Sequence, residues 1–311
     1  MQVRAWTGSD EVARVYIAEA EGGRHVEFVE SIEPPLPREK KWVLIVSTLF
    51  GCPGGCRFCD AGGSYDGKLS AGEILFQIDY MIDRRYPGRR VPAEKFKVQL
   101  ARMGEPALND AVLDVLEILP SRYDAPGLMP ALSTIAPAGR EAFFERLLGI
   151  GTDIYKGRFQ LQFSLHTTDA EKRDWLLPPK KWDFPTIAKY GERFHVDGGR
   201  KITLNFALAE GMPLDAAVLF SHFDPDKFLV KLTPVNPTCE ADRSGVRSSI
   251  VKGVEPEAVI TPLRDAGYEV LLSIGELEEN HIGSNCGQFI KSYLDSGAEF
   301  KAGYNYELEK T

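Results

Sequence analysis

Residues 42–60 read WVLIVSTLFGCPGGCRFCD, a stretch that joins an apolar run to a cluster of cysteines. The run Trp42–Ser47 is apolar and β-rich, which predicts a buried strand. The segment after it places three cysteines among glycines, which predicts a loop. Ligand sites of parallel α/β sheets lie where strands end. A strand followed at once by a cysteine loop is therefore the first indication of such a sheet.

Similar apolar runs recur along the chain and alternate with helical patterns. The further predicted strands are Phe96–Leu100, Met129–Ser133, Phe159–Ser164, Lys201–Phe206, Phe228–Leu232 and Tyr268–Ser273. The predicted helices are Ala71–Ile82, Asp110–Leu119, Arg140–Leu148, Asp183–Phe194, Leu214–Phe220 and Pro256–Ala266. Ser70 and Glu73 form a capping-box signal before the first helix. About six strand–helix units predict an α/β fold, a partial (β/α)6 barrel with helices outside a parallel sheet.

The segment before the barrel has a different pattern. Two short β-like runs, Ala13–Ala18 and His25–Glu30, flank a pair of glycines and predict a β-hairpin. Three prolines between residues 34 and 37 then interrupt the chain. We therefore expect a hairpin extension with a linker over residues 1–40, a barrel with its C-terminal loop over 41–292, and a tail over 293–311.

Composition and charge exclude several classes of protein. The 311 residues are 43% hydrophobic and carry a net charge of −8, as in ordinary globular proteins and unlike disordered or collagen-like chains. Apolar runs fall far short of the roughly 20 residues that cross a bilayer. No apolar signal region follows Met1, so we expect a cytoplasmic protein with no membrane partner. The acidic charge argues against a polyanion as the main partner unless a local basic face exists.

Cys52, Cys56 and Cys59 have the spacing C-x3-C-x2-C on the glycine-rich loop. Three thiolates so placed can bind three irons of a [4Fe–4S] cluster and leave the fourth iron without a protein ligand. A zinc site is the alternative, but structural zinc normally takes four ligands. No fourth Cys or His lies nearby in the sequence, so the pattern favours a cluster.

The spacing after the first barrel strand, with Phe58 before the last cysteine, resembles the radical S-adenosylmethionine (SAM) superfamily. The resemblance implies that the open iron binds SAM. It implies that one-electron reduction cleaves SAM to methionine and a 5′-deoxyadenosyl radical. It also implies an electron donor such as flavodoxin or ferredoxin.

Further motifs follow in the order of that superfamily. The sequence Met103-Gly104-Glu105-Pro106 is similar to its GEP motif, in which Glu105 would hold the SAM amino group. The SAM-contacting positions that the resemblance implies are Gly104, Glu105, Ser133, Ser164, Leu165, His166 and Asn236. Each motif alone is a common turn or strand end. Five such motifs in the same order after the cysteine motif are, by contrast, a specific indication of the superfamily.

Their spacing resembles one branch, the RlmN/Cfr-type adenine methyltransferases of RNA. Cys286 lies in a sequence similar to the Cys-Gly-Gln loop of that branch. The resemblance implies that SAM methylates Cys286 and that a radical on this methyl adds to an unsaturated substrate carbon. It also matches Glu27 to a glutamate that accepts a proton from the substrate base. The alternative for Glu27 is an exposed strand residue without a catalytic role.

The chain departs from the branch in three respects. Ile45 stands where the branch has a second cysteine, which releases the covalent adduct by forming a disulfide. Cys239 is the remaining thiol outside the cysteine motif, and it is either a substitute or an inert loop residue. Only about 40 residues precede the barrel, where the branch carries an RNA-binding domain. Finally, Glu276, Glu278 and Glu279 precede the Cys286 loop and would repel phosphate.

Three functions are therefore compared. The first is methyl transfer through Cys286 to RNA or a smaller substrate. The second is direct hydrogen abstraction from a small molecule or peptide, without methyl transfer. The third is a non-enzymatic iron–sulfur or zinc protein, which the intact SAM motifs disfavour. Formation of S-adenosylhomocysteine together with 5′-deoxyadenosine distinguishes the first from the second.

Overall fold

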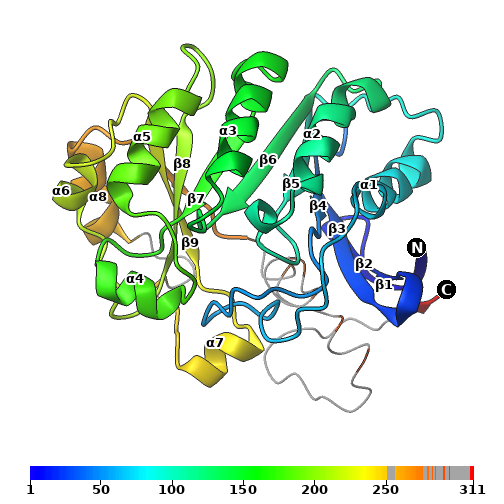
Figure 1. Ribbon diagram of the computed structural model, residues 1–311, viewed down its shortest axis with the longest axis horizontal. Helices are drawn as coiled ribbons and strands as arrows, with labels where there is room; N and C mark the ends of the chain where they lie inside the picture. The colour runs from blue at the N-terminus through cyan, green and yellow to red at the C-terminus, as the bar shows by residue number, and fades with distance from the viewer. Residues whose placement is uncertain are drawn as a thin grey trace.

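The fold is organised around six parallel strands that follow one another in both sequence and space (Figure 1). The computed structural model describes residues 1–250 and 256–275, together with Glu279, Ile282, Ser284, Ile290, Leu294 and residues 309–311. The six strands are β4 (Lys41–Val46), β5 (Lys95–Leu100), β6 (Leu128–Thr134), β7 (Gln160–Ser164), β8 (Ile202–Leu208) and β9 (Phe228–Pro234). A short seventh strand, β10 (Val270–Leu272), pairs parallel with β9. The predicted partial barrel is confirmed.

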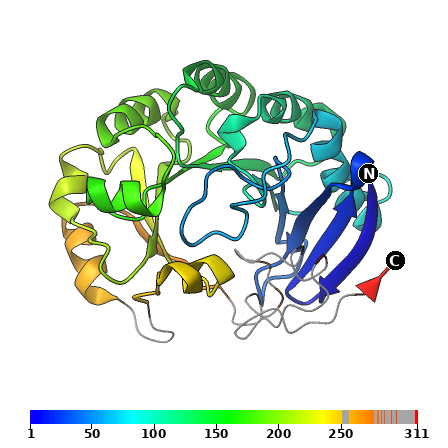
Figure 2. The same ribbon diagram turned by 60° about the horizontal axis from the view of Figure 1, so that its bottom comes forward.

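Helices cover the outer side of this curved sheet, and the strands line its inner side (Figure 2). The α-helices are α1 (Ala71–Arg85), α2 (Ala111–Arg122), α3 (Glu141–Gly149), α4 (Ala170–Leu176), α5 (Phe184–Phe194), α6 (Ala216–Phe220), α7 (Cys239–Ser244) and α8 (Glu257–Asp265). Ser70 and Glu73 form the predicted capping box of α1. The short helices α4 and α7 were not predicted from the sequence. None of the described helices is both long and apolar enough to span a membrane.

Along the strands, side chains that point into the apolar core alternate with side chains that point to the inner face of the sheet. In β4 and β5 every second side chain is buried and the intervening ones are half-buried. The buried set is Trp42, Leu44, Val46, Phe96, Val98 and Leu100. These side chains belong to the main apolar core, which also includes residues of α1 and α2. The half-buried set therefore faces the inside of the barrel, which we call the lumen.

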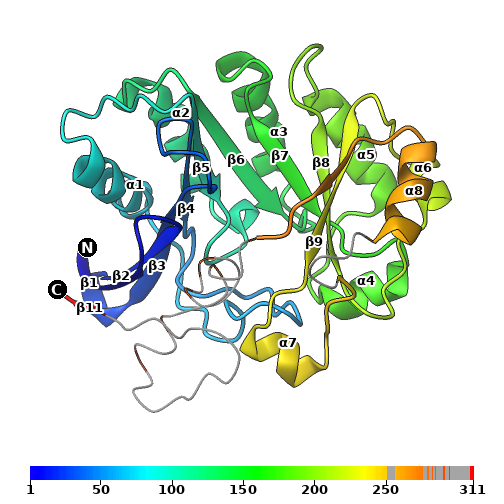
Figure 3. The ribbon, with the colours of Figure 1, turned by 180° about the vertical axis from the view of Figure 1, so that it is seen from behind.

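Antiparallel strands extend the sheet beyond β4. The predicted hairpin exists as β2 (Ala13–Glu19) and β3 (His25–Ser31), and β3 pairs with β4. Strand β1 (Gln2–Gly8) and the two-residue strand β11 (Glu309–Lys310), which the sequence did not predict, complete this side. The N- and C-terminal residues consequently lie side by side (Figure 3).

Candidate functional site

The cysteine loop, residues 51–60, begins at the carboxyl end of the barrel, five residues after the last residue of β4, and crosses the middle of the arc of strands (Figure 2). A Cβ atom built on Gly54 would meet Cys52 Sγ at 3.3 Å and Cys56 Sγ at 3.8 Å. Both sulfur atoms therefore lie against one glycine. Gly51 has a φ of +71°, and a Cβ atom there would meet the Ser64 carbonyl oxygen at 2.0 Å. Only glycine fits such a turn.

The three thiols form one electrostatic group. Burial raises the pKa of Cys56 well above its usual value, and the charges of Cys59, Cys52 and Glu105 raise it further. All three cysteines are half-buried and none is in a disulfide. Within the described residues, no three Cys, His, Asp or Glu side chains are arranged to hold one metal ion. Three thiols of one loop suit a cluster whose irons each take one cysteine.

Glu105 lies directly beside this loop, in the turn between β5 and α2. Its carboxylate accepts hydrogen bonds from the Ile135 N–H at 2.9 Å and the Ala107 N–H at 3.0 Å. The Thr134 hydroxyl donates a third. Burial raises the pKa of Glu105, and these three donors oppose the shift. The charge of Glu105 also raises the pKa of Cys52, so the acidic group and the thiols share one small region.

The turn that carries Glu105 is held closely to the cysteine loop. Gly104 has a φ of +97°, and a Cβ atom there would meet Leu49 Cβ at 2.5 Å. The Asn109 amide donates to the Thr48 and Leu69 carbonyl oxygens, at 2.8 and 2.7 Å. These two residues stand on either side of the cysteine loop in the chain. Asn109 therefore fixes the spacing between the two motifs.

The remaining predicted SAM positions lie at the ends of other strands. Ser133 and Ser164 are half-buried in β6 and β7, Leu165 is buried, and Asn236 is half-buried after β9. His166 is buried with a φ of +67°, an uncommon conformation for a side-chain-bearing residue. Its Nδ1 accepts the Ala207 N–H at 2.9 Å. Burial lowers its pKa to about 3, so the ring is neutral at pH 7.

His166 also connects the strand ends to the cysteine loop. Its ring stands edge-on to the Phe58 ring, with centroids 4.9 Å apart. Phe58 is the aromatic residue directly before Cys59. The structure thus brings the cysteines, Glu105 and His166 to one end of the barrel, as the sequence predicted.

Comparison with known proteins gives the family. The dual-specificity RNA methyltransferase RlmN of Wolinella succinogenes is 27% identical over 300 residues, which span 90% of this chain and 81% of that protein. The probable dual-specificity RNA methyltransferase RlmN of Thermus thermophilus is 30% identical over 263 residues, spanning 81% of this chain and 68% of that protein. The chain belongs to the RlmN family. No family model matches the sequence.

A solved structure agrees with this assignment at the level of fold. The crystal structure of a radical SAM methyltransferase from Sphaerobacter thermophilus superposes with a TM-score of 0.70 and 21% identity. The match covers 93% of this chain and 81% of that one. As a member of the RlmN family, this protein is a radical SAM methyltransferase, and its cofactors are a [4Fe–4S] cluster and SAM.

Glu27 is buried and ion-paired in the structure, whereas the alternative interpretation of the sequence placed it on the exposed surface of a strand. Its side chain is fully buried and its Oε1 pairs with Arg102 Nη2 at 2.6 Å. Oε2 accepts the Ile290 N–H at 2.9 Å, and Arg102 Nη1 donates to the Ser284 carbonyl oxygen at 3.0 Å. The solvent-exposed interpretation is therefore wrong. The pair contacts the chain on both sides of Cys286, which itself lies outside the described residues.

The structure also places Ile45, which stands where the family has its second cysteine, and Cys239, the possible substitute. Ile45 lies on the lumen face of β4, paired in register with Val29 and Gln99. Cys239 is the first residue of α7 rather than a loop residue, and its N–H donates to Asp60 Oδ2 at 3.3 Å. Asp60 immediately follows the last cysteine of the motif, so Cys239 lies against the cysteine loop.

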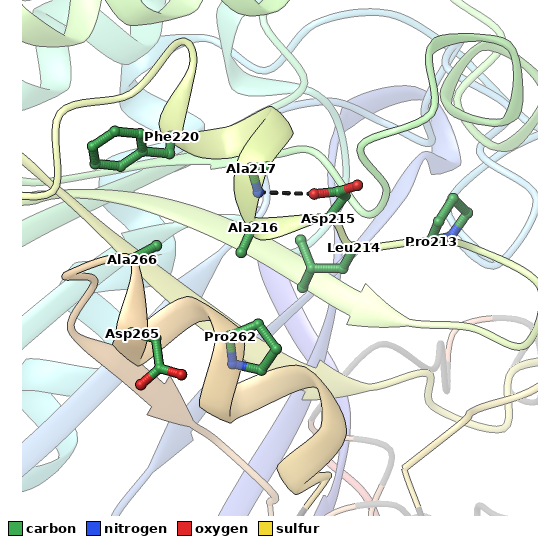
Figure 4. A pocket seen from close by; sticks show the side chains of 9 residues that line it. All are labelled: Pro213, Leu214, Asp215, Ala216, Ala217, Phe220, Pro262, Asp265 and Ala266. Carbon is green, nitrogen blue, oxygen red and sulfur yellow. Dashed lines mark hydrogen bonds between the residues drawn. The ribbon is translucent and has the colours of Figure 1, made fainter.

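A hollow of about 940 Å³ lies on the outer helical layer between α6 and α8 (Figure 4). Its lining includes Leu214, Phe220 and Pro262, and none of the predicted site residues. It plays no part in the site of this RlmN-family protein. The residues that sequence reasoning missed are Arg102, Thr134 and Asp60, each adjacent to a motif residue but outside the motif pattern.

Proposed function

We propose that this protein transfers a methyl group through Cys286 to an unsaturated carbon of RNA or of a smaller substrate. The observation that carries the proposal is the placement of three half-buried thiols beside the Glu105 carboxylate at the carboxyl ends of the strands. Cys52, Cys56 and Cys59 would hold the [4Fe–4S] cluster. When bound, this group supplies the single electron that cleaves the SAM sulfonium. An electron donor such as flavodoxin or ferredoxin would reduce the cluster again after each SAM cleavage.

Glu105 would bind the amino group of SAM. Three donors hold its carboxylate in one orientation, so little ordering is needed when SAM binds. A positive amino group also offsets the cost of a buried carboxylate. His166 would contribute to the same site as a neutral ring, because burial lowers its pKa to about 3 and its Nδ1 accepts a backbone N–H. Gly104, Ser133, Ser164, Leu165 and Asn236 would complete the SAM site.

Glu27 would act next to Cys286. Its ion pair with Arg102 contacts the chain at Ser284 and Ile290, two residues before and four residues after the proposed methyl carrier. A buried glutamate whose pKa is raised by burial is suited to accept a proton. The named relatives act on RNA, which makes RNA the first substrate to test.

Incubation with SAM is expected to add the mass of one methyl group to Cys286. Mass spectrometry of the anaerobically purified protein measures this, with S-adenosylhomocysteine quantified in parallel. Cys239→Ala is the matched control and should gain the methyl as the wild type does, because alanine keeps the backbone N–H that donates to Asp60 and only the thiol is removed. A methyl group on any residue other than Cys286, or none at all, would contradict the proposed carrier.

Replacing Glu105 with glutamine is expected to leave the iron content unchanged and weaken SAM binding by roughly tenfold. The loss corresponds to one charge-assisted hydrogen bond. Equilibrium binding of SAM to the loaded protein measures it. Glu192→Gln, the same change at an exposed glutamate of α5, is the control and should bind SAM normally. Unchanged affinity in Glu105→Gln would exclude the assigned contact.

A further inference from the structure

Asn205 carries a buried polar atom that no residue in the described part of the chain satisfies. It lies in the middle of β8, and only 8% of its surface is exposed. Its side-chain oxygen is buried and accepts no hydrogen bond from any described residue. Buried polar atoms without partners are uncommon in folded proteins, because the hydrogen bonds that they lose to water are not replaced. The oxygen is therefore a candidate contact for a molecule that the protein binds.

The side chain of Asn205 points into the lumen. Its neighbours Leu204 and Phe206 are fully buried and belong to the main apolar core, which also includes residues of α5. Successive side chains of a strand point to opposite faces of the sheet. Asn205 therefore points away from the helices and toward the inside of the barrel.

Asn205 lies beside three of the proposed SAM positions. It is in register with Ser164 of the neighbouring strand β7, and neighbouring strands are about 4.8 Å apart. Phe163 belongs to the main core, so Ser164 also points into the lumen. The Asn205 carbonyl oxygen accepts the N–H groups of Leu165 and His166, at 3.0 and 3.2 Å. The amide side chain thus faces the same space as the Ser164 hydroxyl.

The position of Asn205 is also close to the cysteine loop. Ala207, two residues further along β8 on the same face, belongs to a second and smaller apolar cluster. Cys56 and Phe58 of the cysteine loop pack against that cluster. Two residues of a strand span about 7 Å. Asn205 therefore lies about 7 Å deeper in the barrel than a residue of the cluster that the cysteine loop contacts.

The chemistry of SAM decides which of its groups suits this place. The hydrogen-bond donors of SAM are its methionine amino group, its ribose hydroxyls and its adenine amino group. Glu105 is the proposed partner of the methionine amino group. The ribose is joined to the sulfonium through a single CH2 group, so its hydroxyls stay close to the bond that is cleaved, whereas the adenine amino group lies at the far end of the molecule. A donor just below the cysteine loop is therefore best supplied by the ribose.

We propose that the Asn205 side-chain oxygen accepts a hydrogen bond from a ribose hydroxyl of SAM and makes tight binding depend on that hydroxyl. The inference rests on the SAM site of the proposed function, to which it adds a residue. The buried acceptor gains its partner only when SAM is bound. A site built to hydrogen-bond a hydroxyl discriminates strongly against ligands that lack it. Asn205 is then a specificity-determining residue.

The test compares ligands that differ by one hydroxyl. Equilibrium binding to the anaerobic, iron-loaded protein is measured for S-adenosylhomocysteine and for its 2′-deoxy and 3′-deoxy analogues. Asn205→Leu keeps the approximate size of the side chain and removes its polar atoms. It is expected to weaken binding of S-adenosylhomocysteine by about tenfold, the effect of one lost hydrogen bond in a buried site. At least one deoxy analogue should bind the wild type and Asn205→Leu equally, because neither complex can form the bond.

Thr203→Val is the matched control. Thr203 is buried on the same face of β8, two residues deeper, and valine removes its hydroxyl with little change of size. This variant should bind S-adenosylhomocysteine and both analogues as the wild type does. Asn205→Asp keeps an oxygen acceptor at the same position and should keep the preference for the complete ribose.

Thermal unfolding checks that Asn205→Leu is folded and tests the starting observation. The free variant should melt at or above the wild type, because an apolar side chain replaces a buried oxygen without a partner. S-adenosylhomocysteine should raise the melting temperature of the wild type more than that of the variant, since the wild type binds it more tightly. A clearly lower melting temperature of the free variant would show that Asn205 has a structural partner, and would overturn the proposal.

The binding data can also overturn the proposal. Equal affinity of the wild type and Asn205→Leu for S-adenosylhomocysteine would do so, and so would an equal loss for this ligand and both deoxy analogues. Methylation of Cys286 is a separate measurement. Its absence in a wild type that retains the ribose preference would refute the proposed function and leave this inference standing. A methylated Cys286 without any ribose preference would do the reverse.

Discussion

Cys56→Ala is expected to lose both the brown iron–sulfur colour and all reductive cleavage of SAM. Cys56 is the middle ligand of the proposed set, and its thiol interacts with Cys52, Cys59 and Glu105. Its removal leaves two thiols for a cluster that needs three. Iron analysis and the visible spectrum of the anaerobic protein measure the first loss, and 5′-deoxyadenosine production measures the second.

Cys239→Ala is the control for this experiment. It removes a thiol of similar exposure that lies against the same loop, and it should retain about four irons per chain together with SAM cleavage. Iron content and cleavage at the wild-type level in Cys56→Ala would show that the cluster is held elsewhere.

Arg102→Met is expected to lower the free energy of unfolding by about 3–5 kcal/mol, the usual cost of leaving one member of a buried ion pair without its partner. Glu27 would remain fully buried with the Ile290 N–H as its remaining donor among the described contacts. Denaturant unfolding followed by circular dichroism measures the change. The double variant Glu27→Gln/Arg102→Met should recover much of the loss, since no buried charge is left.

The loss of folding stability caused by Arg102→Met is expected to depend on pH in one direction. Burial already raises the pKa of Glu27, and removal of Arg102 takes away the main opposing influence. A carboxyl whose pKa is higher in the folded state favours folding at pH values below its unfolded pKa, and this contribution is lost as the pH rises. The deficit of Arg102→Met should therefore shrink as the pH falls from 7 toward 5. A deficit that grows over this range would exclude an uncompensated Glu27 carboxylate.

The strand–helix alternation was predictable because it depends on local apolar periodicity, which β4 and α1 carry clearly in their own sequences. The capping box at Ser70 was predictable for the same reason. Strand β1 was missed because its run QVRAWTG mixes polar and apolar residues and depends on pairing with β2. Local patterns do not contain such partners.

In the candidate site, too, the contiguous motifs were predictable from the sequence, whereas contacts between residues far apart in the chain were not. The cysteine spacing and the turn around Glu105 are contiguous motifs, so the sequence indicated them directly. The burial of Glu27 depends on Arg102, which lies 75 positions later in the chain, and on Ile290, 263 positions later. A single sequence gives no periodic signal for this arrangement.

Asp60 and Phe58 give the cysteine loop a mechanical connection to α7. The Asp60 carboxylate accepts the N–H groups of Cys239 and Glu240, and the Thr238 hydroxyl donates to the Phe58 carbonyl oxygen. Asn236 stands two residues before that cap. Any ligand that rigidifies the loop must therefore raise the free energy needed to unwind this helix, and ordering of the helix must stabilise the loaded loop by the same amount. With the cysteine loop as the proposed cluster site and Asn236 as a proposed SAM contact, cluster loading and SAM affinity are expected to be reciprocally coupled through α7.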